Sequence, residues 1–224
     1  MSDDSELSPS DLSYLPIFPL PEAVLLPHEL VPLHIFEPRY QAMIASCLAH
    51  EEPLALAQIH PVALLSGELV EPVRLLPIIG VGRIVESEPL EEGRSNIVVR
   101  GIARARIRAE IAGDEPFRRV RAELLEDEDG DSEQAAHLSE QLRQLLLTFC
   151  TSLPGRGPQA LLEHAAQAES ASELADLVGA AILDTTRDRQ ALLEELNVPR
   201  RLQRVYDAAT AILARTMPRG EQLN

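Results

Sequence analysis

Hydrophobic and polar positions divide the chain into a first part with strand-like patterns and a second part with helical ones. The clearest strand pattern lies at residues 103–111, where alanine and isoleucine alternate with arginine and glutamate, as expected of a strand that buries one face. Further strands are predicted at 15–20, 30–36, 53–60, 74–90, 97–101 and 117–127. Because short connections join neighbouring segments, the pattern predicts a mostly antiparallel, closed or half-closed barrel.

An acidic run at 126–134 separates these strands from the helical part. Beyond it, Ser132 can cap a helix whose apolar stripe extends to Leu153, and Ser170 with Glu173 has the form of a capping box. Other helices are predicted at 159–168, at 189–196 and from Pro199. The predicted fold class is therefore α+β, with a β-rich pseudo-barrel followed by an α-helical bundle. The expected domains are a disordered acidic tail (1–13), the β-rich domain (14–128), the helical bundle (129–217) and a flexible tail (218–224).

Residues 15–40 form a proline-rich segment that holds six prolines among short apolar runs. Proline fixes φ and donates no backbone hydrogen bond, which excludes a helix here and also excludes the middle strand of a sheet. Two short extended pieces joined by a rigid loop are expected, followed by a helix that opens at Pro38. This helix is expected to bury one face, made of Tyr40, Met43, Ile44, Cys47 and Leu48.

Charge and composition narrow the range of functions. The net charge of −16 argues against nucleic acid as a partner, because its phosphates would be repelled. No apolar run approaches the ~18 residues that cross a bilayer, so no membrane partner is expected. The acidic N-terminus fits no signal or transit peptide, so a cytoplasmic protein is expected. All 20 Lys-or-Arg positions are arginine, which excludes a P-loop lysine, a Ser–Lys dyad and a Schiff-base lysine within this sequence.

Candidate catalytic and metal-binding groups do not converge in the sequence. His28 and His34 lie six positions apart, but a metal site needs three or four ligands, and no metal is expected here. The G-x-G at 80–82 lacks the third glycine of a dinucleotide-binding loop and is expected to mark a bulge or bend in a strand. Cys47 and Cys150 lie on apolar helical faces and are expected to pack in the core without a disulfide. We therefore expect no catalytic residue and no cofactor.

Arginines on the strand at 103–111 form the one basic surface expected on this acidic chain. They are Arg104, Arg106 and Arg108, with Arg118, Arg119 and Arg121 on the partner strand. One interpretation of this arginine stripe is a dock for an acidic peptide or partner subunit, through bidentate guanidinium contacts. The other is a solvated sheet face whose arginines pair with Glu110 and Glu123.

Three blocks of the sequence, in this order, resemble the N-terminal, substrate-binding domain of Lon protease. The first is LPIFPLPEAVLLPHELVPLHIFEPRYQAMI (15–44), with the turn Leu26-Pro27-His28 and the strand Val31-Pro32-Leu33. The second is IIGVGRIVESEPLEEGRSNIVVRGIARARI (78–107), and the third is DRQALLEELNVPRRLQRV (188–205). Matching positions in these two blocks are Gly80, Gly82, Gly101, Arg104, Gln190, Leu193, Arg201 and Leu202. The resemblance spans about residues 14–215.

The resemblance implies a PUA-like pseudo-barrel followed by a helical bundle, and a non-catalytic module that recognises unfolded or degron-bearing proteins. The sequence is similar to the stand-alone Lon-domain type found in bacteria, without the ATPase and peptidase domains, so no enzymatic activity is expected. Contacts with a bound peptide are expected in the proline-rich segment and in the groove it forms against the helices. The candidate residues are Leu26, Pro27, His28, Phe36 and Tyr40. The alternative role for each of them is core packing or scaffold.

Two other functions stay open. One is an adaptor or regulator that docks on a separate AAA+ protease, through the arginine stripe or the acidic run at 126–133. The other is a small-molecule-binding or enzymatic cleft between the barrel and the bundle. Recovery of an AAA+ protease from a native lysate would favour the first, and residual peptidase activity of the purified protein would favour the second.

Overall fold

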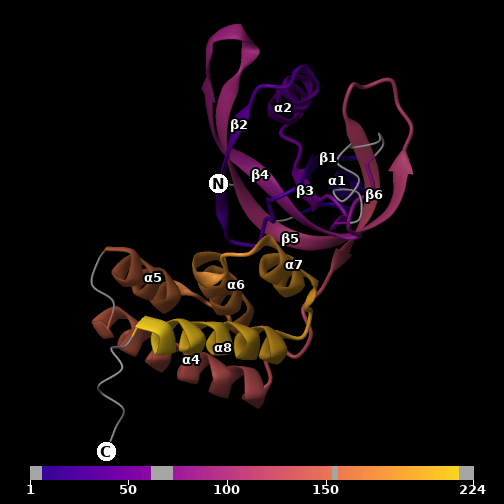
Figure 1. Cartoon of the computed structure of the whole chain (residues 1–224). Coiled ribbons are helices and arrows are strands. Elements are labelled where there is room, and N and C mark those ends of the chain that lie inside the picture. The colour runs from indigo at the N-terminus through magenta and orange to yellow at the C-terminus, as the bar shows by residue number, and fades with distance from the viewer. Residues whose placement is uncertain (1–6, 62–72, 153–155, 217–224) are drawn as a thin grey trace, which may run out of the picture. The chain divides into compact units, whose positions relative to one another are not determined.

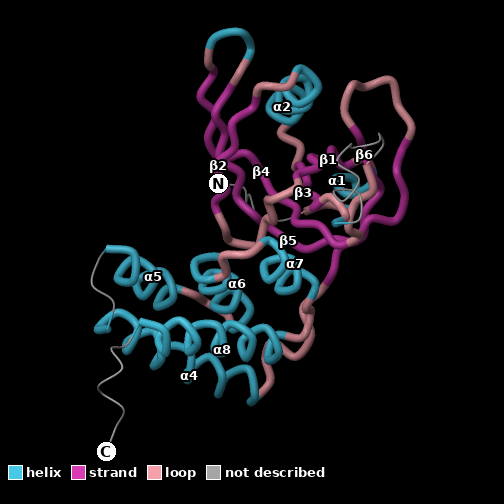
Figure 2. The backbone as a smooth tube through the Cα atoms, viewed as in Figure 1, coloured by secondary structure: helices cyan, strands magenta, loops and turns pink. Residues whose placement is uncertain are grey.

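The computed structural model describes residues 7–61, 73–152 and 156–216 (Figure 1). Contacts within the chain divide it into two compact units, Met1–Glu126 and Asp127–Asn224. The described part of the first unit is built on a β-sheet, and the described part of the second unit is built from helices (Figure 2). The predicted α+β fold class is confirmed.

The first unit is a sheet that closes on itself. Its elements are α1 (Pro9–Ser13), β1 (Leu15–Leu20), β2 (Leu30–Ile35), α2 (Pro38–His50), β3 (Leu54–Gln58), β4 (Ile78–Pro89), the 3-10 helix η1 (Glu91–Gly93), β5 (Ser95–Ile111) and β6 (Arg118–Leu125). The strand order is β2-β5-β4-β3-β1-β6, and β6 also pairs with β5. Pairing therefore runs in a circuit through β5, β4, β3, β1 and β6, and β2 is added to β5 as an edge strand. Among these pairings β1–β3 is parallel and the others are antiparallel.

Irregularities in β4 and β5 bend the sheet. The register of the β4–β5 pairing shifts between Val81 and Gly82 and again between Ile84 and Glu86. The first shift falls within the G-x-G that the sequence marks as a bulge or bend. A bulge increases the local twist and kinks its strand, and a sheet of few strands needs such bends in order to close.

Strand β1 lies between β3 and β6, so the prediction that the proline-rich segment contributes no middle strand is wrong. Its two ladders overlap only at Ile17, because β6 pairs with residues 15–17 and β3 pairs with residues 17–20. Pro16 lies where only β6 is paired, and Pro19 lies where only β3 is paired. Because the backbone donors of a strand alternate between its two edges, prolines three positions apart leave their gaps on opposite edges. The staggered ladders thus accommodate both prolines.

Helix α2 packs its apolar face against the inner side of β2 and β5. Four of its predicted core side chains are buried: Tyr40, Met43, Ile44 and Cys47. They form one cluster with Ile35 of β2 and with Ile97 and Val99 of β5. Leu48, predicted on the same face, is 47% exposed, and that part of the prediction is wrong.

Part of the segment predicted to be a disordered tail is the helix α1. The hydroxyl of Ser8 accepts a hydrogen bond from the N–H of Asp11 at 3.3 Å, and the Asp11 carboxylate accepts one from the N–H of Ser8 at 2.9 Å. This capping box satisfies donors that a short helix would otherwise leave open. Burial of Leu12 anchors the helix on the sheet. Residues 1–6 and the predicted flexible tail at 218–224 lie outside the described residues.

The second unit packs five described helices. They are α4 (Glu133–Ser152), α5 (Arg156–Gln167), α6 (Ala171–Ile182), α7 (Thr186–Glu194) and α8 (Val198–Thr216). Ser170 caps α6 by accepting from the N–H of Glu173 at 3.0 Å, as its sequence predicts. Thr185 caps α7 by accepting from the N–H of Asp188 at 3.1 Å, so this helix begins three residues before the predicted start at 189.

Arg201 is a buried charge that connects the first residue of the second unit with α6 and α8. Its side chain is fully buried and donates to Asp127 Oδ1 at 2.6 Å and to Ser172 Oγ at 2.6 Å. The carboxylate of Asp176, also fully buried, lies 3.9 Å from its Nε. Because a buried cation is tolerated only when it is paired, Arg201 fixes the relative position of these segments. Its neighbour Leu202 is fully buried as well, so the Arg-Leu pair of the third sequence block has a structural role.

Candidate functional site

The five predicted contact residues divide into buried and exposed positions. Leu26, Pro27 and Tyr40 are buried, whereas His28 and Phe36 are exposed. Only the two exposed side chains can meet a ligand without a rearrangement of the core. Of these two, His28 lies just before β2 and Phe36 lies directly after it.

Two glycines make room for the buried part of this segment. A Cβ added at Gly80 would lie 2.0 Å from the backbone oxygen of Leu25, and one added at Gly101 would lie 2.0 Å from that of Leu26. No side chain fits at such distances, so glycine is required where one backbone crosses another. The N–H of Gly101 also donates to the carbonyl of Glu29 at 2.8 Å. This glycine crossing, which pattern reasoning on the sequence missed, fixes the start of β2 on the sheet.

Past the crossing, β2 presents a row of side chains to solvent. The outer row consists of Leu30, Pro32 and His34, with Phe36 directly after the strand. Leu30 is 58% exposed and Phe36 is 61% exposed. The rings of His34 and Phe36 stack with 6.1 Å between their centroids. Among the described strands β2 pairs with β5 alone, so this row lies on an edge strand.

Hydrogen bonds extend the outer row across two neighbouring strands. His34 is paired in register with Asn96 of β5, which is paired with Glu88 of β4. The distance from His34 Nδ1 to Asn96 Oδ1 is 2.8 Å, and that from Asn96 Nδ2 to Glu88 Oε2 is 3.2 Å. Because the amide oxygen of Asn96 can only accept, Nδ1 of His34 carries the proton in this arrangement. The three side chains therefore hold one another in fixed orientations.

A second in-register set across the same three strands consists of Pro32, Val98 and Glu86. This set and the set of His34, Asn96 and Glu88 line an open groove of about 480 Å³, which we call the outer groove. Its lining residues are Pro32, Leu33, His34, Glu86, Ser87, Glu88, Asn96, Ile97 and Val98. This lining contains two exposed carboxylates and no arginine. Apolar and acidic groups thus lie side by side on a rigid sheet surface.

The predicted arginine stripe does not lie on one exposed face. Arg108 is exposed and Arg106 is partly exposed, but Arg104 is only 3% exposed. The predicted alternation is therefore wrong at Arg104. At this position β5 lies between β4 and β6, whereas its first residues lie between β4 and β2. A bent strand that changes neighbours does not keep one face in water along its whole length.

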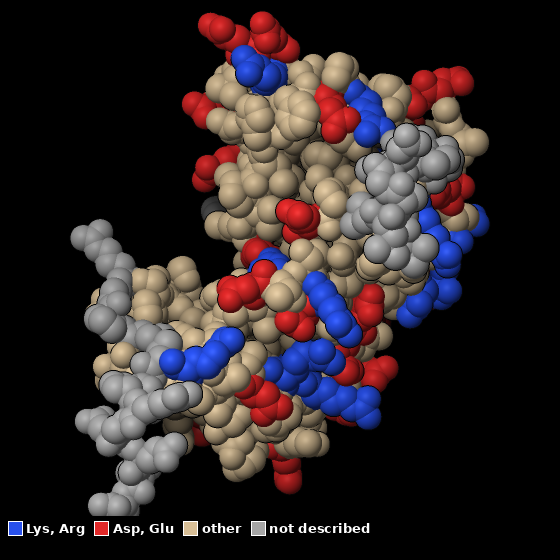
Figure 3. All heavy atoms as spheres, in the orientation of Figure 1, with Lys and Arg blue, Asp and Glu red and all other residues tan. Residues whose placement is uncertain are grey.

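One arginine of β5 and one of β6 pair with glutamates of the same sheet. Arg108 forms an ion pair with Glu123, and Arg118 forms one with Glu110. On the face drawn in Figure 3, basic and acidic side chains are likewise interspersed. These pairs favour the interpretation of the stripe as a solvated sheet face.

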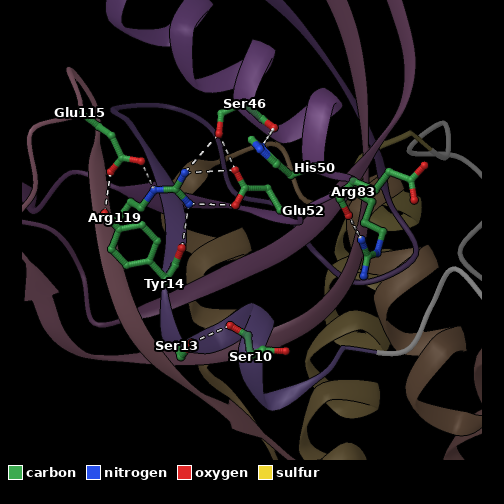
Figure 4. A network of polar contacts seen from close by, with 10 residues as sticks. Ser10, Ser13, Tyr14, Ser46, His50, Glu52, Arg83, Glu115 and Arg119 are labelled. Atoms are coloured by element: carbon green, nitrogen blue, oxygen red, sulfur yellow. Dashed lines mark hydrogen bonds and ion pairs between the residues drawn. The ribbon is translucent and has the colours of Figure 1, made fainter.

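Arg119, also predicted on the outer face, is instead the centre of a buried polar network (Figure 4). Its two Nη atoms donate to the carboxylate of Glu52 at 2.9 and 3.1 Å, and its Nε donates to Glu115 at 2.9 Å. Further bonds reach the carbonyl of Tyr14 at 2.9 Å and the hydroxyl of Ser46 at 3.3 Å. The network ties β6 to the residues before β1 and to α2 with the loop that follows it.

The same contacts shift two pKa values in opposite directions. Burial acts to raise the pKa of Glu52, but hydrogen bonds from Arg119 and Ser46 and the charge of Arg119 outweigh burial and lower it. Burial acts to lower the pKa of Arg119, but its contacts with Glu52 and Glu115 outweigh that effect and raise it. Each partner stabilises the charged form of the other, so the network stabilises the fold.

The described residues offer little catalytic chemistry. Among them, no group of three or more His, Cys, Asp or Glu side chains is placed to hold a metal ion. Burial, followed by the charge of Glu52, raises the pKa of the Cys47 thiol to about 12, so it stays protonated at neutral pH and is a poor nucleophile. No helix in this part of the chain has both the length and the hydrophobicity needed to cross a membrane.

Comparisons with known proteins agree on one family. The model of the ATP-dependent protease La (LON) substrate-binding domain matches residues 14–210. Lon protease of Desulfosudis oleivorans is 28% identical over 196 residues, which cover 85% of this chain and 23% of that protein. Lon protease of Salinispora arenicola is 30% identical over 203 residues, which cover 91% of this chain and 24% of that protein. The chain thus spans about a quarter of the length of these relatives.

Solved structures share the fold. The N-terminal domain of the Mycobacterium avium complex Lon protease superimposes with a TM-score of 0.69 at 23% identity, over 88% of this chain and 98% of that one. The Lon N-terminal domain protein from Xanthomonas campestris gives a TM-score of 0.55 at 20% identity, over 87% of this chain and 98% of that one. Both likenesses extend over almost all of the chains compared.

Proposed function

The chain belongs to the family of ATP-dependent protease La (LON) substrate-binding domains, and from this premise we propose that its β-rich unit binds segments of other proteins without cutting them. The observation that carries the proposal is the outer row, where Leu30 and Phe36 expose most of their apolar side chains. Large apolar side chains exposed along one face of an edge strand support a protein-binding surface. Unfolded or degron-bearing proteins expose the apolar side chains that such a row would cover.

Rigidity of the scaffold supports this role. The glycine crossing fixes the chain before β2, and the hydrogen bonds of His34, Asn96 and Glu88 fix its outer face. A surface that is already ordered loses little conformational entropy when it binds. Most of the entropy lost on binding is therefore that of the flexible client. The outer row can therefore bind short apolar segments with few contacts.

Pro32 favours contact through side chains over the addition of a strand. Client segments commonly extend a sheet by pairing with an exposed edge strand, which needs an unbroken series of backbone donors and acceptors. Pro32 lies in the middle of β2 and removes one donor from it, and prolines on edge strands discourage such pairing. We therefore place the client on the outer face of the sheet.

The groups present support binding without catalysis. No lysine occurs in these 224 residues, so they can supply neither a Walker A lysine nor a Ser–Lys dyad. The region matched by the family model is a substrate-binding domain, and the relatives extend well beyond the part that aligns with this chain. The proposed activity is recognition alone.

The proposal is tested with the full chain and a fluorescent, permanently unfolded model protein, followed by anisotropy. We expect the double variant Leu30→Ser, Phe36→Ser to bind about tenfold more weakly than the wild type, because both anchors are removed. The control is Leu147→Ser, which removes a leucine that is 55% exposed on α4. The free energies of unfolding of all three proteins, measured with urea, should agree within about 0.5 kcal/mol, since the changed positions are exposed.

Two results would overturn the proposal. One is the absence of binding by the wild type at tens of micromolar, and the other is an equal loss of affinity in the variant and in the control. Recovery of an AAA+ protease from a native lysate, combined with no binding of unfolded protein, would favour the adaptor role instead.

A further inference from the structure

Resting on the proposed function, we infer that the outer groove selects extended segments in which basic and apolar residues alternate. Pro32 and Leu33 of β2 provide apolar contacts along one side of the groove, and Glu86 and Glu88 of β4 provide carboxylates along the other. β5 lies between them and forms the floor. The two sides thus differ in chemistry while facing the same bound segment.

The carboxylates of the groove are available to a ligand. Both glutamates are exposed, and within the described part of the chain neither belongs to an ion pair. Glu88 Oε2 accepts a hydrogen bond from Asn96, which orients the carboxylate and leaves its second oxygen open to a donor. In contrast, Glu110 and Glu123 on the same sheet are each paired with an arginine. The groove therefore carries unbalanced negative charge.

Strand geometry sets the spacing that a ligand must match. Glu86 and Glu88 lie two positions apart on β4, which is about 7 Å for an extended chain, and β2 and β4 are two strand spacings apart, or about 10 Å. A client lying along β5 directs alternate side chains to opposite sides. Its odd positions then reach the carboxylates, while its even positions reach the apolar residues of β2. Arginine fits the odd positions best, because its guanidinium binds a carboxylate bidentately.

Charge complementarity also excludes other occupants. An acidic segment would meet two unpaired carboxylates on a chain of net charge −16. A second copy of this chain carries the same charge and would be repelled in the same way. A basic and apolar segment is the one polypeptide chemistry that both sides of the groove attract.

The test uses three labelled peptides that are identical except at alternate positions, which carry Arg, Gln or Glu between leucines. We expect the full chain to bind the Arg peptide about fivefold more tightly than the Gln peptide, and the Glu peptide most weakly. The variant Glu86→Gln, Glu88→Gln should bind all three alike. The matched control is Glu91→Gln, Glu92→Gln, which makes the same change of net charge in η1, outside the groove, and should keep the preference.

Salt provides a second readout. At about 0.5 M salt the Arg and Gln peptides should bind wild type with nearly equal affinity, because the surface charges are screened. Equal affinities for all three peptides at low salt, or an unchanged preference in the groove variant, would overturn this inference and leave the proposed function intact. Failure of every peptide and of the unfolded model protein to bind would overturn the proposed function as well.

Discussion

The guanidinium of Arg119 holds the carboxylate of Glu52 with two hydrogen bonds, at 2.9 and 3.1 Å, although 67 positions separate them in the chain. The side chain of Arg119 is 5% exposed and that of Glu52 is 23% exposed. A pair that is largely withdrawn from water depends on both members, because removal of one leaves an uncompensated charge. The contact therefore makes the closure of the pseudo-barrel sensitive to single substitutions.

We expect Arg119→Met to lower the free energy of unfolding by at least about 3 kcal/mol, since Glu52 and Glu115 lose their cation. The control is Arg108→Met, which breaks an ion pair whose arginine is 53% exposed and should cost less than about 1 kcal/mol. Urea denaturation of both variants and the wild type measures the difference. Equal losses in the two variants would show that the buried network has no special weight.

The contacts of Glu52 also predict that the free energy of unfolding depends on pH in the acidic range. The pKa of its carboxyl is lowered in the folded protein from an ordinary value of 4.5, so the folded state binds fewer protons than the unfolded state near that pH. Its contribution to stability is present in full above this range and is lost as the pH falls through the folded-state pKa. The stability advantage of the wild type over Glu52→Gln should therefore be largest near about pH 7 and shrink below about pH 4.5. Denaturation curves at several pH values test this, and a constant difference would contradict it.

Local periodicity predicts the elements of this fold well and their neighbours less well. The alternation at 103–111 identifies β5, and the spacing of Tyr40, Met43, Ile44 and Cys47 identifies the buried face of α2. Periodicity cannot show which strands flank a segment, and so it places Arg104 in water where the structure buries it. Which side chains of a bent strand face solvent depends on the strands that flank it, and the local sequence does not show these.

The candidate site is visible in the sequence only as separate residues. His34 and Phe36 lie in the segment that carries the resemblance, but Asn96, 62 positions from His34, and Glu88 join them only through strand pairing. One signal of the scaffold was present, because glycines inside strands mark close approach by another backbone. Gly80 lies against the backbone of Leu25, and Gly101 lies against the backbone of Leu26. Pairing these two glycines with the two successive leucines would have predicted that Leu26 is buried.

The glycine crossing predicts a large effect of one added methyl group. In Gly101→Ala the new Cβ would meet the Leu26 carbonyl at 2.0 Å, and a backbone atom held on both sides cannot move away cheaply. We expect a loss of more than about 3 kcal/mol in the free energy of unfolding, or no folded protein. Gly157→Ala is the control, because nothing lies within 4 Å of its added Cβ, and the exchange should change the free energy of unfolding by less than about 1 kcal/mol. Thermal and urea unfolding of the two variants measure the contrast, and a Gly101→Ala protein as stable as wild type would contradict the crossing.

The two cysteines should differ sharply in their reaction with a thiol reagent. Cys47 is 2% exposed, and burial raises the pKa of its thiol to about 12, so almost no thiolate forms at about pH 8. Cys150 is only partly buried, and its thiol donates to the carbonyl of Pro158 at 2.8 Å. We expect one thiol per chain to react with an aromatic disulfide reagent in the native protein, and a second to react only on unfolding in guanidinium. In Cys150→Ser the native reaction should disappear while the unfolded protein still yields one thiol. Rapid labelling of both cysteines under native conditions would show that α2 opens far more often than its packed core implies.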